Sequence, residues 1–140
     1  MQQLFILFFM FVMNISAKET IVSIELTYQT RGMQKHLHIT PDSVMVSINE
    51  HKYQYPTSPK QWATIIENLK NIDLEKISTL KRPTKKAASD GAFNAFLTVN
   101  TSQKGFVSSN FDHNQPPQIL VKTIKSMKIV LSKTEHKTEF

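Results

Sequence analysis

Four short segments near the start of the chain alternate apolar and polar residues, and this pattern constrains the fold more than any other feature. Along residues 21–29 the apolar side chains share one face and the polar side chains share the other. Such a period of two is typical of a strand with one buried face. The pattern recurs in residues 36–40, 44–48 and 51–55, and turn residues separate the segments. The sequence therefore predicts consecutive hairpins of an antiparallel sheet.

A helix is predicted directly after these four strands. Ser58 is a favourable N-cap, Pro59 suits the first helical position, and Gln61 can complete a capping box. Apolar residues then recur at helical spacing and should face the sheet. A short second turn of helix should follow. These apolar positions are Trp62, Ile65, Ile66 and Leu69, continued by Ile72, Leu74, Ile77 and Leu80.

The second half of the chain adds two strands and a last helix. Alternation predicts a fifth strand with Phe93, Ala95, Leu97 and Val99 on its inner face, and a sixth strand from Phe106 to Phe111. After Pro116-Pro117, one apolar stripe marks a helix, formed by Leu120, Ile124, Met127 and Leu131. The predicted fold is α+β, with an antiparallel sheet of about six strands and two amphipathic helices on one face, in the order ββββ-α-ββ-α.

The first 17 residues resemble a secretory signal peptide. An unbroken apolar run from Leu4 to Met13 is followed by small and polar residues up to Ala17, and the first charges come after it. The run is shorter than the roughly 20 residues needed to span a bilayer. We therefore expect residues 1–17 to be a signal peptide, residues 18–133 a single domain, and residues 134–140 a flexible tail. This predicts a periplasmic or secreted protein with no transmembrane helix after cleavage.

The chain carries a formal net charge of +6 and no cysteine. An exported domain without disulfides must depend on packing for its stability. The basic residues form one cluster, which can be a binding patch for an anionic partner or simply a solvated loop. Nucleic acid is disfavoured as a partner, because no aromatic residues are interleaved to stack on bases. The cluster consists of Lys81, Arg82, Lys85 and Lys86.

The predicted last helix also has a basic side, which carries Lys122, Lys125 and Lys133. Such a helix can lie on a membrane surface. Alternatively, its apolar stripe packs against the core and its basic side faces water. A peripheral membrane contact is therefore one of the predicted interactions.

Several short motifs resemble small exported domains of Gram-negative bacterial envelopes. The resemblance extends over most of residues 18–140 and implies an α+β fold and an envelope location. It brings no known activity, and so implies no role for any residue. The motifs are Thr30-Arg31-Gly32, Pro41-Asp42-Ser43-Val44, Trp62 with Ile65, Leu69 and Ile72-Asp73-Leu74, Pro83 with Asp90-Gly91-Ala92, and Phe111-Asp112-His113 with Pro116-Pro117 and Leu120.

His36 and His38 are the candidate metal ligands. They flank Leu37 on a predicted strand, so both side chains point to the same face, about 7 Å apart along the chain. Such a pair can bind zinc or copper when a third ligand comes from elsewhere. Without that ligand they are two histidines on the outer side of a hairpin, and the sequence itself predicts no cofactor.

Asp90, Asp112 and His113 are the other polar candidates. Asp112 and His113 could serve acid–base chemistry, although adjacent residues of an extended chain point to opposite sides. Asp112 could instead bond backbone amides and fix a turn, and Asp90-Gly91 is a typical turn pair. Because Asp90 and Asp112 bound neighbouring predicted strands, we expect the two carboxylates to converge, together with Arg31 or Arg82.

The sequence contains no complete catalytic motif, and this favours a non-catalytic binding domain of the envelope, with an envelope protein or an anionic surface as its partner. His51, Tyr53 and Tyr55 share one strand face and would suit a contact surface if that face is open, whereas they are core residues if it is covered. The alternative is a small hydrolase or metal-binding protein that uses Asp90, Asp112 and His113, or His36 and His38.

Overall fold

The computed structural model describes residues 17–140. The predicted signal peptide therefore lies outside the described residues, apart from Ala17. In the described part of the chain, no helix combines the length and the apolar character needed to cross a membrane.

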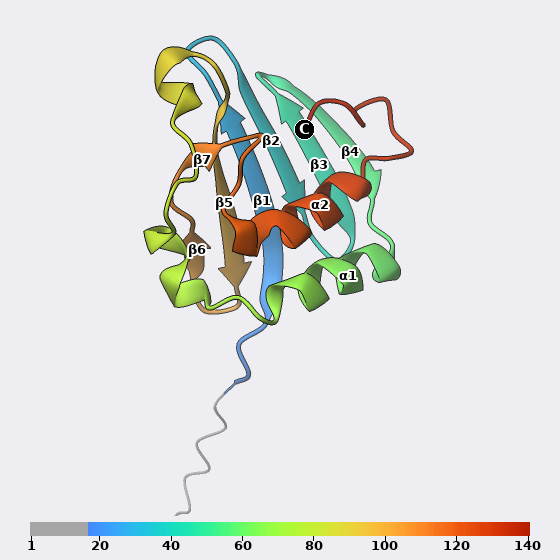
Figure 1. The fold of residues 1–140 in the computed structure, drawn as a ribbon. Coiled ribbons are helices and arrows are strands. Elements are labelled where there is room, and N and C mark those ends of the chain that lie inside the picture. Colours follow the sequence, from blue (N-terminus) through green and yellow to red (C-terminus); the bar gives the residue numbers. More distant parts are fainter. Residues whose placement is uncertain (1–16) are drawn as a thin grey trace, which may run out of the picture.

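The four predicted hairpin strands are confirmed, and they form one half of the sheet (Figure 1). Each strand pairs antiparallel with the next along the chain. The turn between the third and fourth strands contains Asn49 with φ 53°, a left-handed conformation that asparagine tolerates well. The strands are β1 (Ile21–Gln29), β2 (Gln34–Ile39), β3 (Ser43–Ile48) and β4 (His51–Pro56).

Both predicted helices are present. The first, α1 (Pro59–Leu69), begins with the expected capping box, in which Ser58 and Gln61 exchange hydrogen bonds of 3.1 and 2.9 Å. The last helix, α2 (Val121–Ile129), buries the predicted apolar stripe. Three short 3₁₀ helices connect the larger elements: η1 (Leu74–Thr79), η2 (Lys86–Ser89) and η3 (Gln118–Leu120).

The predicted sixth strand, Phe106 to Phe111, is wrong as a single element. The structure divides it into β6 (Gly105–Val107) and β7 (Phe111–Asp112), which both pair with β5 (Asn94–Thr101). Between them the chain leaves the ladder, because Ser109 bonds the carbonyl groups of Ile77 and Leu80 at the end of η1. The sheet thus has seven strands, with the order β4-β3-β2-β1-β5-β6 and β7 beside β5.

One hydrophobic core lies between the sheet and the two helices. Figure 1 shows α1 and α2 crossing the same face of the sheet. Ile65 of α1 and Met127 of α2 are fully buried against the inward residues of β1, β2, β3 and β5. The arrangement of helices on one sheet face is confirmed, and within residues 17–140 no helix covers the other face (Figure 1).

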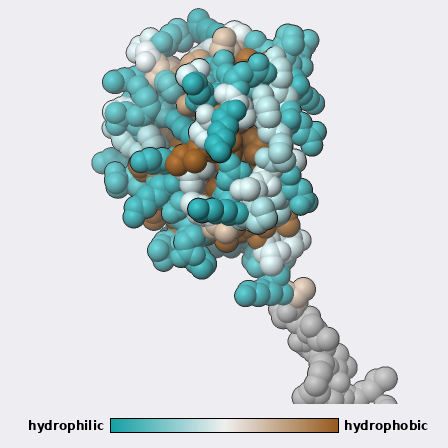
Figure 2. Space-filling model, turned by 90° about the vertical axis from the view of Figure 1, so that its right-hand side faces the viewer, coloured by the Kyte–Doolittle hydropathy of each residue, from teal (hydrophilic) through white to brown (hydrophobic). Residues whose placement is uncertain are grey.

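The edge strand β4 carries several exposed polar residues. His51, Lys52 and Gln54 are exposed, and the view from the side of β4 shows a largely hydrophilic surface with small hydrophobic patches (Figure 2). Charged residues on an edge strand disfavour pairing with other chains. This edge therefore has a common protection against aggregation.

The last residues, predicted as a flexible tail, lie against the sheet. The ring of His136 packs 4.2 Å from that of Tyr53, and Phe140 lies 5.3 Å from Tyr28. Lys35 of β2 forms an ion pair of 2.7 Å with Glu139. Apolar contact and one ion pair therefore hold a segment whose composition alone suggested a free end.

Candidate metal centre

Glu25, His36 and His38 come together on the open face of the sheet. The carboxylate of Glu25 contacts both imidazoles, with His36 Nε2 3.0 Å from Oε2 and His38 Nδ1 3.0 Å from Oε1. Potential ligand atoms of the three residues all lie within 4.8 Å of one another. Glu25 could therefore supply the third ligand, which the sequence alone did not identify.

Strand register explains this geometry. Glu25 on β1 lies directly opposite His38 on β2, and His36 lies opposite Thr27. Alternation sends Ile24 and Leu26 into the core, so Glu25 must face the open side. The carboxylate therefore stands between two imidazoles that are spaced by two residues along β2.

Neighbouring polar groups hold the three side chains in place. Thr27 Oγ1 lies 2.9 Å from His36 Nδ1, and its hydroxyl can donate to or accept from that nitrogen. Asn100 of β5 donates to Glu25 Oε1 at 3.1 Å and to Ser23 at 2.9 Å. Such outer contacts orient metal ligands and fix the imidazole tautomer.

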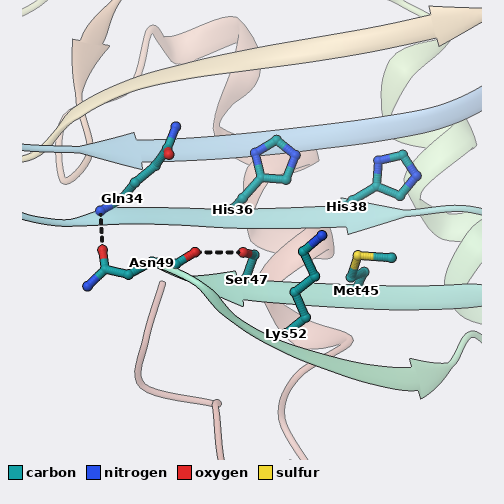
Figure 3. Close-up of a pocket in the computed structure, with 7 residues that line it drawn as sticks. All are labelled: Gln34, His36, His38, Met45, Ser47, Asn49 and Lys52. Carbon is teal, nitrogen blue, oxygen red and sulfur yellow. Dashed lines mark hydrogen bonds between the residues drawn. The ribbon is translucent and has the colours of Figure 1, made fainter.

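The cluster is partly open to water. Side-chain exposure is 34% for His36, 30% for His38 and 21% for Glu25. A hollow of about 400 Å³ adjoins the two histidines on the side away from β1 (Figure 3). Its remaining lining residues are Gln34, Met45, Ser47, Asn49 and Lys52. An ion held by the cluster would keep coordination positions that face solvent.

The observed separations suit a bound ion. Two ligand atoms that each lie about 2.0–2.1 Å from one tetrahedral zinc ion are roughly 3.3 Å apart. The two nitrogen–oxygen distances of 3.0 Å come close to this value. The potential ligand atoms of the three residues lie within 4.8 Å of one another and would move closer together around a bound ion. Two imidazoles and a carboxylate suit zinc, copper, nickel or iron.

Asp112 is a structural residue in this fold. Its fully buried carboxylate accepts hydrogen bonds from Arg82 at 2.7 Å, from Thr84, and from the backbone amides of Lys86 and Ala87. Burial alone would raise the pKa of Asp112, but these hydrogen bonds outweigh burial and lower it. Asp112 thus fastens the basic loop to the sheet, in line with the amide-bonding interpretation of the sequence.

Of the other predicted polar residues, Arg82 contacts Asp112, whereas in residues 17–140 no hydrogen bond or ion pair joins Asp90 or His113 to the Asp112 carboxylate. Asp90, at the end of η2, is exposed and lines a shallow hollow with Arg31, whereas Arg82 contacts Asp112. His113 accepts a hydrogen bond from the amide of Phe93 at 3.1 Å, and burial and the nearby Lys128 lower its pKa. In the structure, the residues expected to form one polar site thus make separate contacts.

The basic cluster is also divided. Lys81, Lys85 and Lys86 are exposed, but Arg82 is tied to Asp112. The cluster therefore has three exposed lysines instead of four exposed cationic side chains.

Two other surfaces expected from the sequence have different positions in the structure. Tyr53 and Tyr55 pack against the core and are covered by His136, because the parity of β4 directs them toward the helix side. Of the two interpretations that the sequence left open for this strand face, the structure shows the one in which Tyr53 and Tyr55 are core residues, and only His51 of that set is exposed. The apolar stripe of the last helix is likewise buried in the core. Ile129, which lies outside this stripe, is exposed.

Comparison of the chain with family models, curated proteins and solved structures finds no match.

Proposed function

We propose that this protein is an exported, non-catalytic binding domain that holds a transition-metal ion through Glu25, His36 and His38. The observation that carries the proposal is the placement of two imidazole nitrogens 3.0 Å from the two oxygens of a single carboxylate. The export part of the proposal rests on the apolar run from Leu4 to Met13.

The sheet supports binding because it sets the ligands in advance. All three residues belong to paired strands, and Thr27 and Asn100 restrict the rotation of His36 and Glu25. Less side-chain entropy is then lost when an ion binds. Partial exposure gives the ion a direct path from solvent, so binding needs no opening of the fold.

Binding is favoured over hydrolysis by the residues around the open positions. A hydrolytic centre needs a general base beside the water that it activates. In residues 17–140, the hollow next to the histidines is lined by neutral side chains and Lys52, and no carboxylate lines it. Glu25 itself is engaged by both imidazoles and Asn100.

The test is a calorimetric titration of the purified, metal-free protein with Zn²⁺. We expect one ion per chain, and His36→Ala or His38→Ala should weaken binding by at least the roughly 10- to 100-fold that loss of a group supporting a metal ligand costs, because each change removes a ligand itself. Glu25→Gln should weaken it as well, because an amide is a poorer ligand than a carboxylate.

His51→Ala is the matched control. His51 is an exposed histidine on β4 that faces the opposite side of the sheet. Its removal should leave the Zn²⁺ affinity unchanged. Absence of binding to the unsubstituted protein, or equal losses in the His51 and His36 variants, would contradict the proposal.

A further inference from the structure

Met45 lies beside the candidate metal centre on the open face. It stands directly opposite His38 in the pairing of β2 with β3 and lines the hollow next to both histidines (Figure 3). Directly opposed residues on one face have Cβ atoms about 4.5–5.5 Å apart. Its chain neighbours Val44 and Val46 are fully buried on the other face, so Met45 is not part of the core. Its side chain therefore lies on the open face, beside the hollow that adjoins His38 (Figure 3).

A thioether discriminates between metal ions. Methionine sulfur is a soft ligand that binds Cu⁺ well, whereas Zn²⁺ is satisfied by imidazole and carboxylate. Methionine is also unbranched, with three rotatable bonds, so its sulfur can move toward an ion without a change in the backbone. Met45 thus adds a ligand for Cu⁺ and little for Zn²⁺.

Two charged groups border the centre, and both act more strongly on a divalent ion than on a monovalent one: Glu25 attracts it and Lys52 repels it. Glu25 supplies one negative charge, which neutralises a monovalent ion but leaves a divalent ion with an excess positive charge. Lys52 extends from β4 toward β2 and lines the same hollow (Figure 3). Its ammonium group repels a divalent cation twice as strongly as a monovalent cation at the same distance.

We propose that Met45 completes a Cu⁺ site with His36 and His38, and that the centre prefers Cu⁺ to Zn²⁺. This inference rests on the proposed function, because it assigns a fourth ligand and an ion to the same centre. The ion is bound as Cu⁺ and keeps its oxidation state, so no electron or proton transfer is required beyond release of the proton from each nitrogen that coordinates.

The experiment measures the affinity for both ions in matched variants. Cu⁺ is supplied under a reductant, and the protein competes for it with a chromophoric Cu⁺ chelator; Zn²⁺ affinity is measured separately by calorimetry. Met45→Leu keeps the size of the side chain but removes its sulfur. We expect this variant to lose about tenfold or more in Cu⁺ affinity, a loss typical of a weakened metal site, and to retain its Zn²⁺ affinity.

Met33→Leu is the control, since Met33 is an exposed methionine in the turn before β2. It should leave both affinities unchanged. The inference is overturned if Met45→Leu leaves Cu⁺ binding intact, if it lowers both affinities equally, or if the unsubstituted protein does not prefer Cu⁺. Zn²⁺ binding that depends on His36 and His38 supports the proposed function in each of those cases. A protein that binds neither ion overturns both proposals.

Discussion

At the scale of single residues, Asp112 and Glu25 show two different uses of a carboxylate. Asp112 is fully buried and receives four hydrogen bonds from the loop that it anchors. Glu25 is partly exposed and bridges two imidazoles that a metal ion can also bind. Burial with several donors makes the first carboxylate structural, whereas access to solvent leaves the second able to exchange its partners.

Asp112→Asn should destabilise the protein by about 3 kcal/mol, because it leaves the Arg82 guanidinium without its counter-charge in a largely buried place. The measurement is urea unfolding at pH 7. Asp42→Asn, a change at an exposed aspartate in the turn before β3, is the control and should have little effect. Equal stability of the two variants would contradict a structural role for Asp112.

The same contact predicts how stability depends on pH. The pKa of Asp112 is lowered below the value of about 3.9 for an unfolded aspartate, so the native state releases this proton more readily than the unfolded state. Its stabilisation is then fully present above about pH 4 and is lost as the pH falls toward the folded-state pKa. The Asp112→Asn variant should therefore lose less of its free energy of unfolding than the unsubstituted protein when urea unfolding is measured at decreasing pH.

At the scale of elements, the helices were the most predictable part of the fold. Ser58, Pro59 and Gln61 marked the start of α1 because capping depends on residues adjacent in sequence. The split of β6 from β7 was not predictable, because it depends on hydrogen bonds from Ser109 to η1, about thirty residues earlier in the chain.

The candidate site was predictable only in part, for a related reason. Alternation placed His36 and His38 on one face and Glu25 on the outer face of its own strand. Which residue of β1 stands opposite His38 depends on the register of the hairpin, and the turn of residues 30–33 sets that register. A shift of one residue would have removed Glu25 from the histidines. The sequence alone thus identifies residues that can act as ligands, but it does not show that strand pairing brings all three together.

The capping box gives a prediction for α1. Ser58→Ala removes the acceptor for the amide of Gln61 and should lower the free energy of unfolding by about 1 kcal/mol. Chemical denaturation compared with Ser132→Ala checks this, since Ser132 is exposed beyond α2. An unchanged Ser58 variant would show that the cap does not contribute.

At the scale of the whole molecule, the C-terminal segment acts as a cover for one end of the core. It places His136 over Tyr53 and Phe140 against Tyr28, while Glu139 contacts Lys35. Through these contacts, residues 136–140 pack as part of the folded domain.

Deletion of residues 136–140 should lower the free energy of unfolding by about 2 kcal/mol, the value for one large apolar side chain removed from its burial site. Thermal and urea unfolding of the shortened chain measure the effect, with Lys137→Ala as a control that changes an exposed residue of the same segment. A shortened chain as stable as the original would restore the expectation of a flexible tail.

The topology also has a consequence for the order in which the chain assembles. Strands β1 to β4 are joined by short turns, so their pairing closes only small loops. The pairing of β1 with β5 instead connects Leu26 with Leu97, far along the chain, and carries a greater entropy cost of closure. We expect the four-strand meander to form early and β5 to dock late. Because Glu25, His36 and His38 belong to the first hairpin and Met45 belongs to the next strand of the meander, an ion would meet all of the proposed ligands while the rest of the chain is still folding.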